Sequence, residues 1–150
     1  MQPVKAFVFP LVLGLALAAA AQMPTCTREC CPNHFSVIQG FLGELQTLQK
    51  TTKTENATTF ANHYDQQKAQ TFLGLTAGAF QDAAKHFGEL HDAANQKAAT
   101  ELAAMLTADQ QKLETEKTPA AAQTDFNAVN LAIVLPTKVD AAPPAATPAK

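Results

Sequence analysis

The sequence has no tryptophan and a single tyrosine, Tyr64, and this scarcity limits the surfaces that the protein can present. Tryptophan and tyrosine are the side chains that most often anchor tight protein interfaces, so we expect no aromatic-rich interface. Positive charge is also scarce, because the 150 residues hold 11 Lys and Arg against 13 Asp and Glu, with no strongly basic stretch. A nucleic-acid-binding surface needs clustered positive charge, so we expect no nucleic-acid partner.

Catalytic motifs are missing as well. The chain has no glycine-rich phosphate loop, no serine nucleophile elbow and no His-Glu-x-x-His pair. We therefore predict that the protein is not an enzyme. We also expect it to need no cofactor, apart from the copper or zinc that is weighed below for its cysteines.

Residues 1–21 have the pattern of a signal peptide. Lys5 provides the short positive region, an apolar run follows it, and Ala19, Ala20 and Ala21 form a small-residue cleavage site. The apolar run is too short for a typical membrane span, which needs about 20 strongly apolar residues, although an uncleaved anchor remains the alternative. We expect cleavage after Ala21, no stable membrane span afterwards and a secreted or periplasmic location. The mature chain then keeps ten basic against 13 acidic residues, a net charge of −3.

All three cysteines, Cys26, Cys30 and Cys31, lie in the segment 22–32 that precedes the first expected helix. Cysteines of exported proteins usually form disulfides. A Cys26–Cys30 or Cys26–Cys31 bridge is feasible, because residues one helical turn apart have Cα atoms within the distance that a disulfide tolerates. Three is an odd number, so one thiol is left to bridge to an unknown protein partner or to a second copy of the chain.

The same segment supports a second hypothesis, in which the protein handles copper or zinc. Cys26, Cys30, Cys31 and His34 supply three thiolates and one imidazole within nine residues, and these are ligands that Cu(I) and Zn²⁺ prefer. The spacing differs from that of common zinc sites, in which two separated Cys pairs hold the ion. Metal handling therefore stands as the alternative to a disulfide-linked binding or structural protein.

Hydrophobic periodicity predicts helices throughout residues 33–135. A first helix is expected over 33–51, capped by Asn33, with apolar residues at helical spacing from Phe35 to Leu48. The next apolar positions recur at steps of three or four, as expected for one helical face, with one gap at Lys68. They are Phe60, Tyr64, Phe72, Leu75, Ala79, Ala83, Phe87, Leu90, Ala94, Ala98, Leu102 and Met105.

Gly74 and Gly78 lie close together in this stretch, and glycine both weakens a helix and permits a turn. We therefore predict two helices, over 55–73 and 79–106, with Thr54 or Asn56 as the cap of the first. One long helix with a soft spot is the alternative.

The residues after 106 predict shorter helices and a tail. Thr107 and Gln110 have the spacing of a capping box and are expected to start a short polar helix that ends near Lys117. Thr118 and Pro119 mark a second start, and the last apolar run, 131–135, fits a helix or an extended segment equally well. Residues 136–150 are rich in alanine and proline and are expected to form a disordered tail. The sum is an all-α, up-and-down bundle of about four helices over residues 33–135.

The five residues from Leu106 to Gln110 resemble the Leu-Thr-x-x-Gln signature of periplasmic helical chaperones. That resemblance implies a chaperone-like or surface-binding amphipathic bundle, which is the second alternative function. The family carries the motif twice and has a strongly basic concave face. This chain carries the motif once and is acidic overall. A capping box accounts for the same residues without any relationship to that family.

Three histidines, His63, His86 and His91, are interspersed with the acidic residues Asp65, Asp82, Glu89 and Asp92. A di-iron bundle needs a Glu-x-x-His pair on each of two helices, and here one pair occurs, in the reverse order. We therefore expect solvated histidines that flank the core, with Asp82 and His86 as a surface pair. Asn56 begins an Asn-x-Thr sequon, which predicts glycosylation if the protein comes from a eukaryote.

Overall fold

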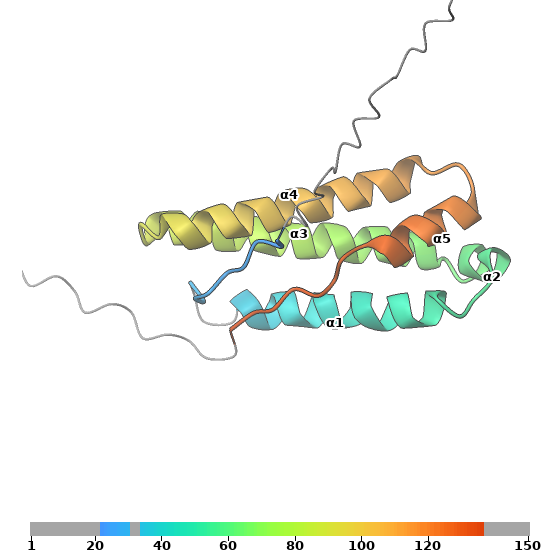
Figure 1. Ribbon diagram of the computed structural model, residues 1–150, viewed down its shortest axis with the longest axis horizontal. Helices are drawn as coiled ribbons and strands as arrows, with labels where there is room; N and C mark the ends of the chain where they lie inside the picture. Colours follow the sequence, from blue (N-terminus) through green and yellow to red (C-terminus); the bar gives the residue numbers. More distant parts are fainter. Residues whose placement is uncertain (1–21, 31–33, 137–150) are drawn as a thin grey trace, which may run out of the picture.

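Five helices make up the helical part of the described chain, which comprises residues 22–30 and 34–136 of a computed structural model. They are α1 (His34–Thr52), α2 (Ala57–Asn62), α3 (Asp65–Glu89), α4 (Ala93–Thr115) and α5 (Pro119–Ala128). The long helices α1, α3 and α4 run alternately up and down, α5 returns beside them, and the short α2 closes one end (Figure 1). The all-α bundle predicted from the sequence is confirmed.

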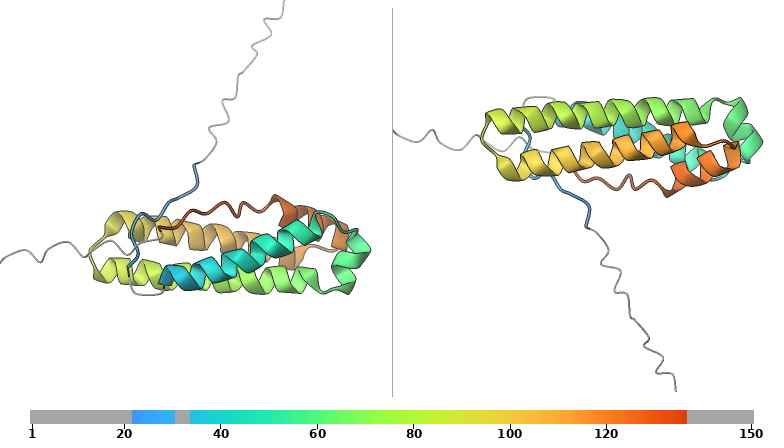
Figure 2. Two further views of the ribbon diagram at one scale, coloured as in Figure 1. Left: turned by 90° about the horizontal axis from the view of Figure 1, so that it is seen from below. Right: turned by 90° about the horizontal axis from the view of Figure 1, so that it is seen from above.

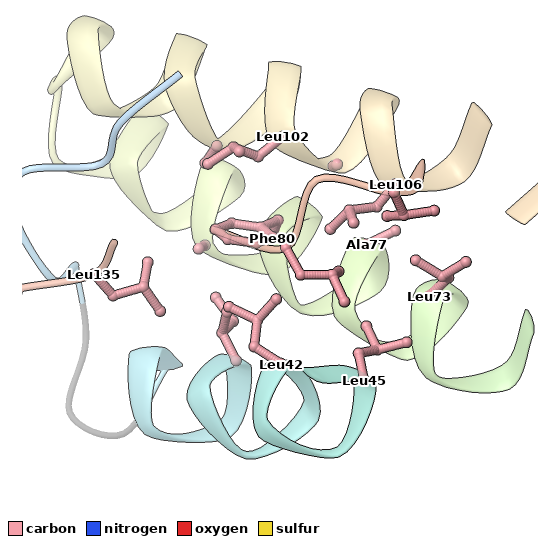
Figure 3. Close-up of a cluster of buried hydrophobic side chains, with 14 of the residues drawn as sticks. Leu42, Leu45, Leu73, Ala77, Phe80, Leu102, Leu106 and Leu135 are labelled. Atoms are coloured by element: carbon pink, nitrogen blue, oxygen red, sulfur yellow. The ribbon is translucent and has the colours of Figure 1, made fainter. Parts of the chain in front are cut away.

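The core lies between α1 and the hairpin of α3 and α4, which is the most extensively packed pair of helices. The predicted first helix is confirmed almost to the residue, and its apolar face is buried at Phe35, Ile38, Leu42 and Leu45. Figure 3 shows side chains from the three helices meeting in one cluster. Its labelled members are Leu42, Leu45, Leu73, Ala77, Phe80, Leu102, Leu106 and Leu135.

The predicted break at Gly74 and Gly78 is wrong, because α3 continues through both glycines. Neither has a positive φ, so neither forms a turn. At Gly74 the missing side chain instead makes room for α4: a Cβ there would lie 2.7 Å from Nε2 of Gln110. The missing side chain therefore leaves room for the end of the Gln110 side chain, and Gly74 does not mark a change of direction.

The chain reverses at two other places, and both use a residue other than glycine. Tyr64 and His91 have left-handed φ values of 57° and 55°, at the starts of α3 and α4 respectively. Asp92 then caps α4 by accepting a hydrogen bond from the Asn95 amide at 3.2 Å. Both the predicted pair of helices and the alternative single helix over 55–106 are thus replaced by three helices, α2, α3 and α4.

The apolar face predicted for residues 60–105 is correct in part. Phe60, Ala83, Phe87, Ala98 and Leu102 are buried as predicted. Five predicted members are exposed instead: Ala94 and the larger side chains Tyr64 (65%), Leu75 (45%), Leu90 (50%) and Met105 (39%). Tyr64 and Leu90 lie at the chain reversals. Between residues 72 and 80, the buried face of α3 runs through Leu73, Ala77 and Phe80 instead of Leu75.

The helix predicted to start at Thr107 is also wrong, because α4 continues to Thr115. The Thr107 hydroxyl donates to the Ala103 carbonyl at 2.8 Å, one turn back, and so does not cap a new helix. The start at Thr118 and Pro119 is confirmed, with the Thr118 hydroxyl accepting from the Ala121 amide. After α5 the described chain is extended to residue 136 and runs back beside α1 (Figure 2).

No helix among the described residues is long and apolar enough to cross a lipid bilayer. The predicted signal peptide 1–21, the predicted cap Asn33 and nearly all of the predicted tail lie outside the described residues, as does Cys31.

Candidate functional site

The cysteine-containing segment 22–30 packs against the bundle. Its main anchor is Asn95, a buried residue in the first turn of α4. The Asn95 side-chain oxygen accepts from the Thr27 amide at 2.7 Å and from the Thr27 hydroxyl at 3.2 Å. Arg28 adds an ion pair with Asp92 at 3.2 Å. The segment is thus held at the start of α4, at the end of the bundle opposite α2 (Figure 1).

Cys26 is a free thiol that is buried where segment 22–30 packs against α4, and only 1% of its surface is exposed. Its Sγ lies 3.9 Å from the Asn95 carbonyl oxygen, to which it donates. Burial raises the pKa of the Cys26 thiol to about 11, and the negative charge of Asp92 adds to the shift. Because the thiolate is the reactive form of cysteine, Cys26 is both shielded and chemically inert near neutral pH.

The remaining predicted ligands face other parts of the bundle. Cys30 is half-buried, and its Sγ lies 3.5 Å from the Ala83 carbonyl oxygen on α3. The His34 ring stands edge-on to the His86 ring, with centroids 4.9 Å apart. Among the described residues, Cys26, Cys30 and His34 do not form a group whose ligand atoms are close enough to hold one ion. Since Cys31 lies outside those residues, the four-residue metal site and the disulfides of Cys26 stay predictions.

His86 does not pair with Asp82 as predicted. Its Nδ1 lies 3.0 Å from the Glu89 carboxylate, three residues along α3, and both side chains are substantially exposed. This geometry is a surface contact that contributes a few tenths of a kcal/mol. Asn56 is exposed, and its side-chain oxygen caps α2 by accepting from the Thr59 amide at 2.9 Å. The cap prediction is confirmed, while glycosylation at Asn56 stays a prediction.

His63 lies in a different environment, at the end of the bundle that α2 closes. Its Nδ1 is 3.6 Å from Oε1 of Glu55, and the buried carboxylate of Asp65 completes a group whose ligand atoms all lie within 4.8 Å of one another. The three side chains line a pocket of about 380 Å³ together with residues of α1 and α3, among them Lys68. This is the closest gathering of metal-binding side chains among the described residues.

His63 and Asp65 belong to the histidines and acidic residues singled out from the sequence, whereas Glu55 does not. Glu55 directly precedes the cap of α2, His63 directly follows α2, and Asp65 begins α3. A helix of only six residues brings the groups at its two ends close together, because each residue adds about 1.5 Å along the axis. Two features indicate that α2 is short: Asn56 caps its start, and the left-handed residue Tyr64 follows its end. The left-handed conformation of Tyr64 cannot be recognised from hydrophobic periodicity.

Asn95→Ala is expected to expose Cys26. The substitution removes the acceptor for Thr27, so the segment loses its main anchor and water reaches the thiol. If the Cys26 pKa then falls from about 11 toward its ordinary value of 9.0, alkylation of Cys26 at pH 8 speeds up by up to about 100-fold, because the thiolate fraction rises. Mass-spectrometric labelling of each cysteine measures this rate. Asn62→Ala, at an exposed position of α2, serves as the control, and an unchanged Cys26 rate in Asn95→Ala contradicts the anchor.

No protein-family model, no curated protein and no solved structure matches this chain.

Proposed function

We propose that the chain is an exported helical-bundle protein of binding or structural type, joined covalently to a second copy of itself through Cys30 or Cys31. The proposal that it is not an enzyme rests on the sequence, which carries no catalytic motif. Export rests on the signal-peptide pattern of residues 1–21, because such a segment directs the chain to a compartment where disulfides form and is then removed.

The burial of Cys26 is the observation that carries the proposed linkage. Two sulfurs must approach to about 2 Å to form a disulfide, and a thiol that is 1% exposed cannot meet a cysteine of another chain. An intermolecular bridge therefore falls to the adjacent pair Cys30 and Cys31. The contacts of Thr27 and Arg28 with α4 support the same view, because they hold the residues that precede this pair at one end of the bundle.

Intact mass spectrometry of the secreted protein, without and then with reductant, tests the proposal. We expect a dimer that becomes a monomer on reduction. The double variant Cys30→Ser, Cys31→Ser should be monomeric in both conditions, whereas Cys26→Ala should still form the dimer. A monomer before reduction, or a dimer that survives reduction and the double substitution, contradicts the proposed linkage.

A further inference from the structure

We propose that Glu55, His63 and Asp65 form a binding site for a divalent transition metal, with Zn²⁺ as the cation that fits them best. The site lies at the α2 end of the bundle, and the cysteine segment lies at the other end (Figure 1). These two places are separated by the length of α1, which is 19 residues or about 28 Å. The inference is therefore independent of the cysteine-linked assembly.

The side-chain chemistry is that of a zinc site with an open position. One imidazole nitrogen and two carboxylates are three protein ligands of the kinds that Zn²⁺ accepts, and water fills the fourth position in such sites. The pocket of about 380 Å³ beside the three residues has room for that water. Among its other lining residues, Thr47 and Thr51 of α1 offer hydroxyl groups that can hydrogen-bond the water.

A buried oxygen of Glu55 supplies the second, independent observation. The Glu55 side chain is 13% exposed, yet its Oε2 atom is buried and has no hydrogen-bond partner. A carboxylate oxygen that is buried without a partner costs free energy, because it has lost its water and gained nothing in return. A bound cation removes this cost. The Asp65 side chain is even less accessible, at 4% exposed, so both carboxylates are already positioned by the fold.

The groups need only a small movement to reach coordination geometry. Tetrahedral ligands at zinc distances of about 2.0–2.1 Å lie about 3.3 Å from one another. The His63 Nδ1 and Glu55 Oε1 atoms are already 3.6 Å apart, and all the ligand atoms lie within 4.8 Å. His63 is the most mobile of the three, because its side chain is 61% exposed, so rotation of its ring can close the remaining gap.

Lys68 is the group that competes with the cation. Its Nζ lies 3.0 Å from Oδ1 of Asp65, and its side chain is 54% exposed. The two carboxylates and Lys68 together carry a net charge of −1, which favours a divalent ion over the single ammonium. Binding moves Lys68 away into solvent. Lys68→Met is therefore expected to strengthen zinc binding, by removing the competitor and raising the negative charge of the site.

Zinc titration of the mature protein, followed by competition with a chromophoric chelator, tests the site. We expect one Zn²⁺ per chain and an affinity that falls at least tenfold in His63→Asn and in Glu55→Gln. His91→Asn is the matched control, because His91 is also exposed and asparagine tolerates its left-handed conformation. It should bind zinc as the wild type does. Circular dichroism of every variant confirms that each is folded.

Two further measurements separate this site from the cysteines. Cys30→Ser, Cys31→Ser should keep the Zn²⁺ affinity, and the Co²⁺-substituted protein should show no thiolate-to-cobalt charge-transfer band. If the cysteine variant loses zinc and His63→Asn retains it, the ion belongs to the cysteine cluster and the inference is overturned. Wild-type binding no stronger than that of His63→Asn overturns it as well, and leaves Glu55 and His63 as neighbouring side chains only.

Discussion

Phe80→Ala is expected to lower the free energy of unfolding by about 3–5 kcal/mol, the usual cost of deleting a fully buried aromatic side chain. Phe80 has no exposed surface and occupies the middle of α3, the helix that packs against both α1 and α4. Figure 3 shows its ring among leucines from these helices. Truncation leaves a cavity that none of these helices can fill alone. Since small domains have about 5–15 kcal/mol of stability in total, much of it is lost.

Leu75→Ala on the same helix provides the control. Leu75 is 45% exposed and lies five residues from Phe80, about 140° around the helix. We expect this substitution to cost less than about 1 kcal/mol, because partly exposed positions lose little burial. Urea denaturation of both variants, monitored by circular dichroism, gives the two values. Equal costs at the two positions, or a larger cost at Leu75, contradict the observed orientation of α3.

The comparison of Phe80 with Leu75 also shows why hydrophobic periodicity alone does not identify the buried face of α3. Residues 72–80 contain apolar side chains on more than one side of the helix, and two series satisfy steps of three or four. One runs through Phe72, Leu75 and Ala79, and the other through Leu73, Ala77 and Phe80. The first was predicted and the second is buried. The choice depends on where the helix begins and on which partner it meets, and neither is encoded within the segment.

Capping side chains marked two helix starts correctly and one wrongly, because the capping box predicted at Thr107 and Gln110 lies inside α4. Asn56 was predicted as a cap, and a helix start was predicted at Thr118 because Pro119 follows it. In both places the side chain accepts a hydrogen bond from a later amide. Asp92 caps α4 in the same way, at a point that the apolar periodicity crosses without a break. The break predicted at Gly74 is wrong because this glycine contacts Gln110, which lies 36 residues further along the chain. A contact between residues so far apart in sequence cannot be predicted from the residues around the glycine.

The same distinction explains the candidate sites. The cysteine segment could be identified from the sequence because its residues are neighbours in the chain. Its anchoring to Asn95, 68 residues away from Thr27, could not. The Glu55, His63 and Asp65 group falls between these cases, because its members are close in sequence but meet only when α2 ends after six residues.

Gln49→Met is expected to lower the free energy of unfolding by about 1–3 kcal/mol, because the Val129 carbonyl loses its side-chain donor and the Phe126 carbonyl keeps only the Val129 amide. The last carbonyls of a helix have no partner within the helix, and those at the end of α5 find one in α1. Nε2 of Gln49 lies 3.0 Å from the Phe126 carbonyl oxygen and 3.0 Å from that of Val129. Methionine keeps the length and shape of glutamine but cannot donate, so the change isolates the hydrogen bonds.

The ends of α1 and α5 cap each other through glutamine side chains. Replacing Gln49 is therefore expected to destabilise the protein more than replacing an ordinary surface glutamine. Gln123 of α5 donates to the carbonyls of Thr52 and Glu55, at 2.7 and 2.9 Å, and thereby caps the end of α1. Gln67→Met, at an exposed position of α3, is the matched control and should leave stability within about 0.5 kcal/mol of wild type. Urea denaturation decides between the outcomes, and a Gln49→Met value as small as the control means that water replaces the lost donor. Because Gln123 also holds the backbone of Glu55, this pair of caps fixes one of the three residues proposed to bind zinc.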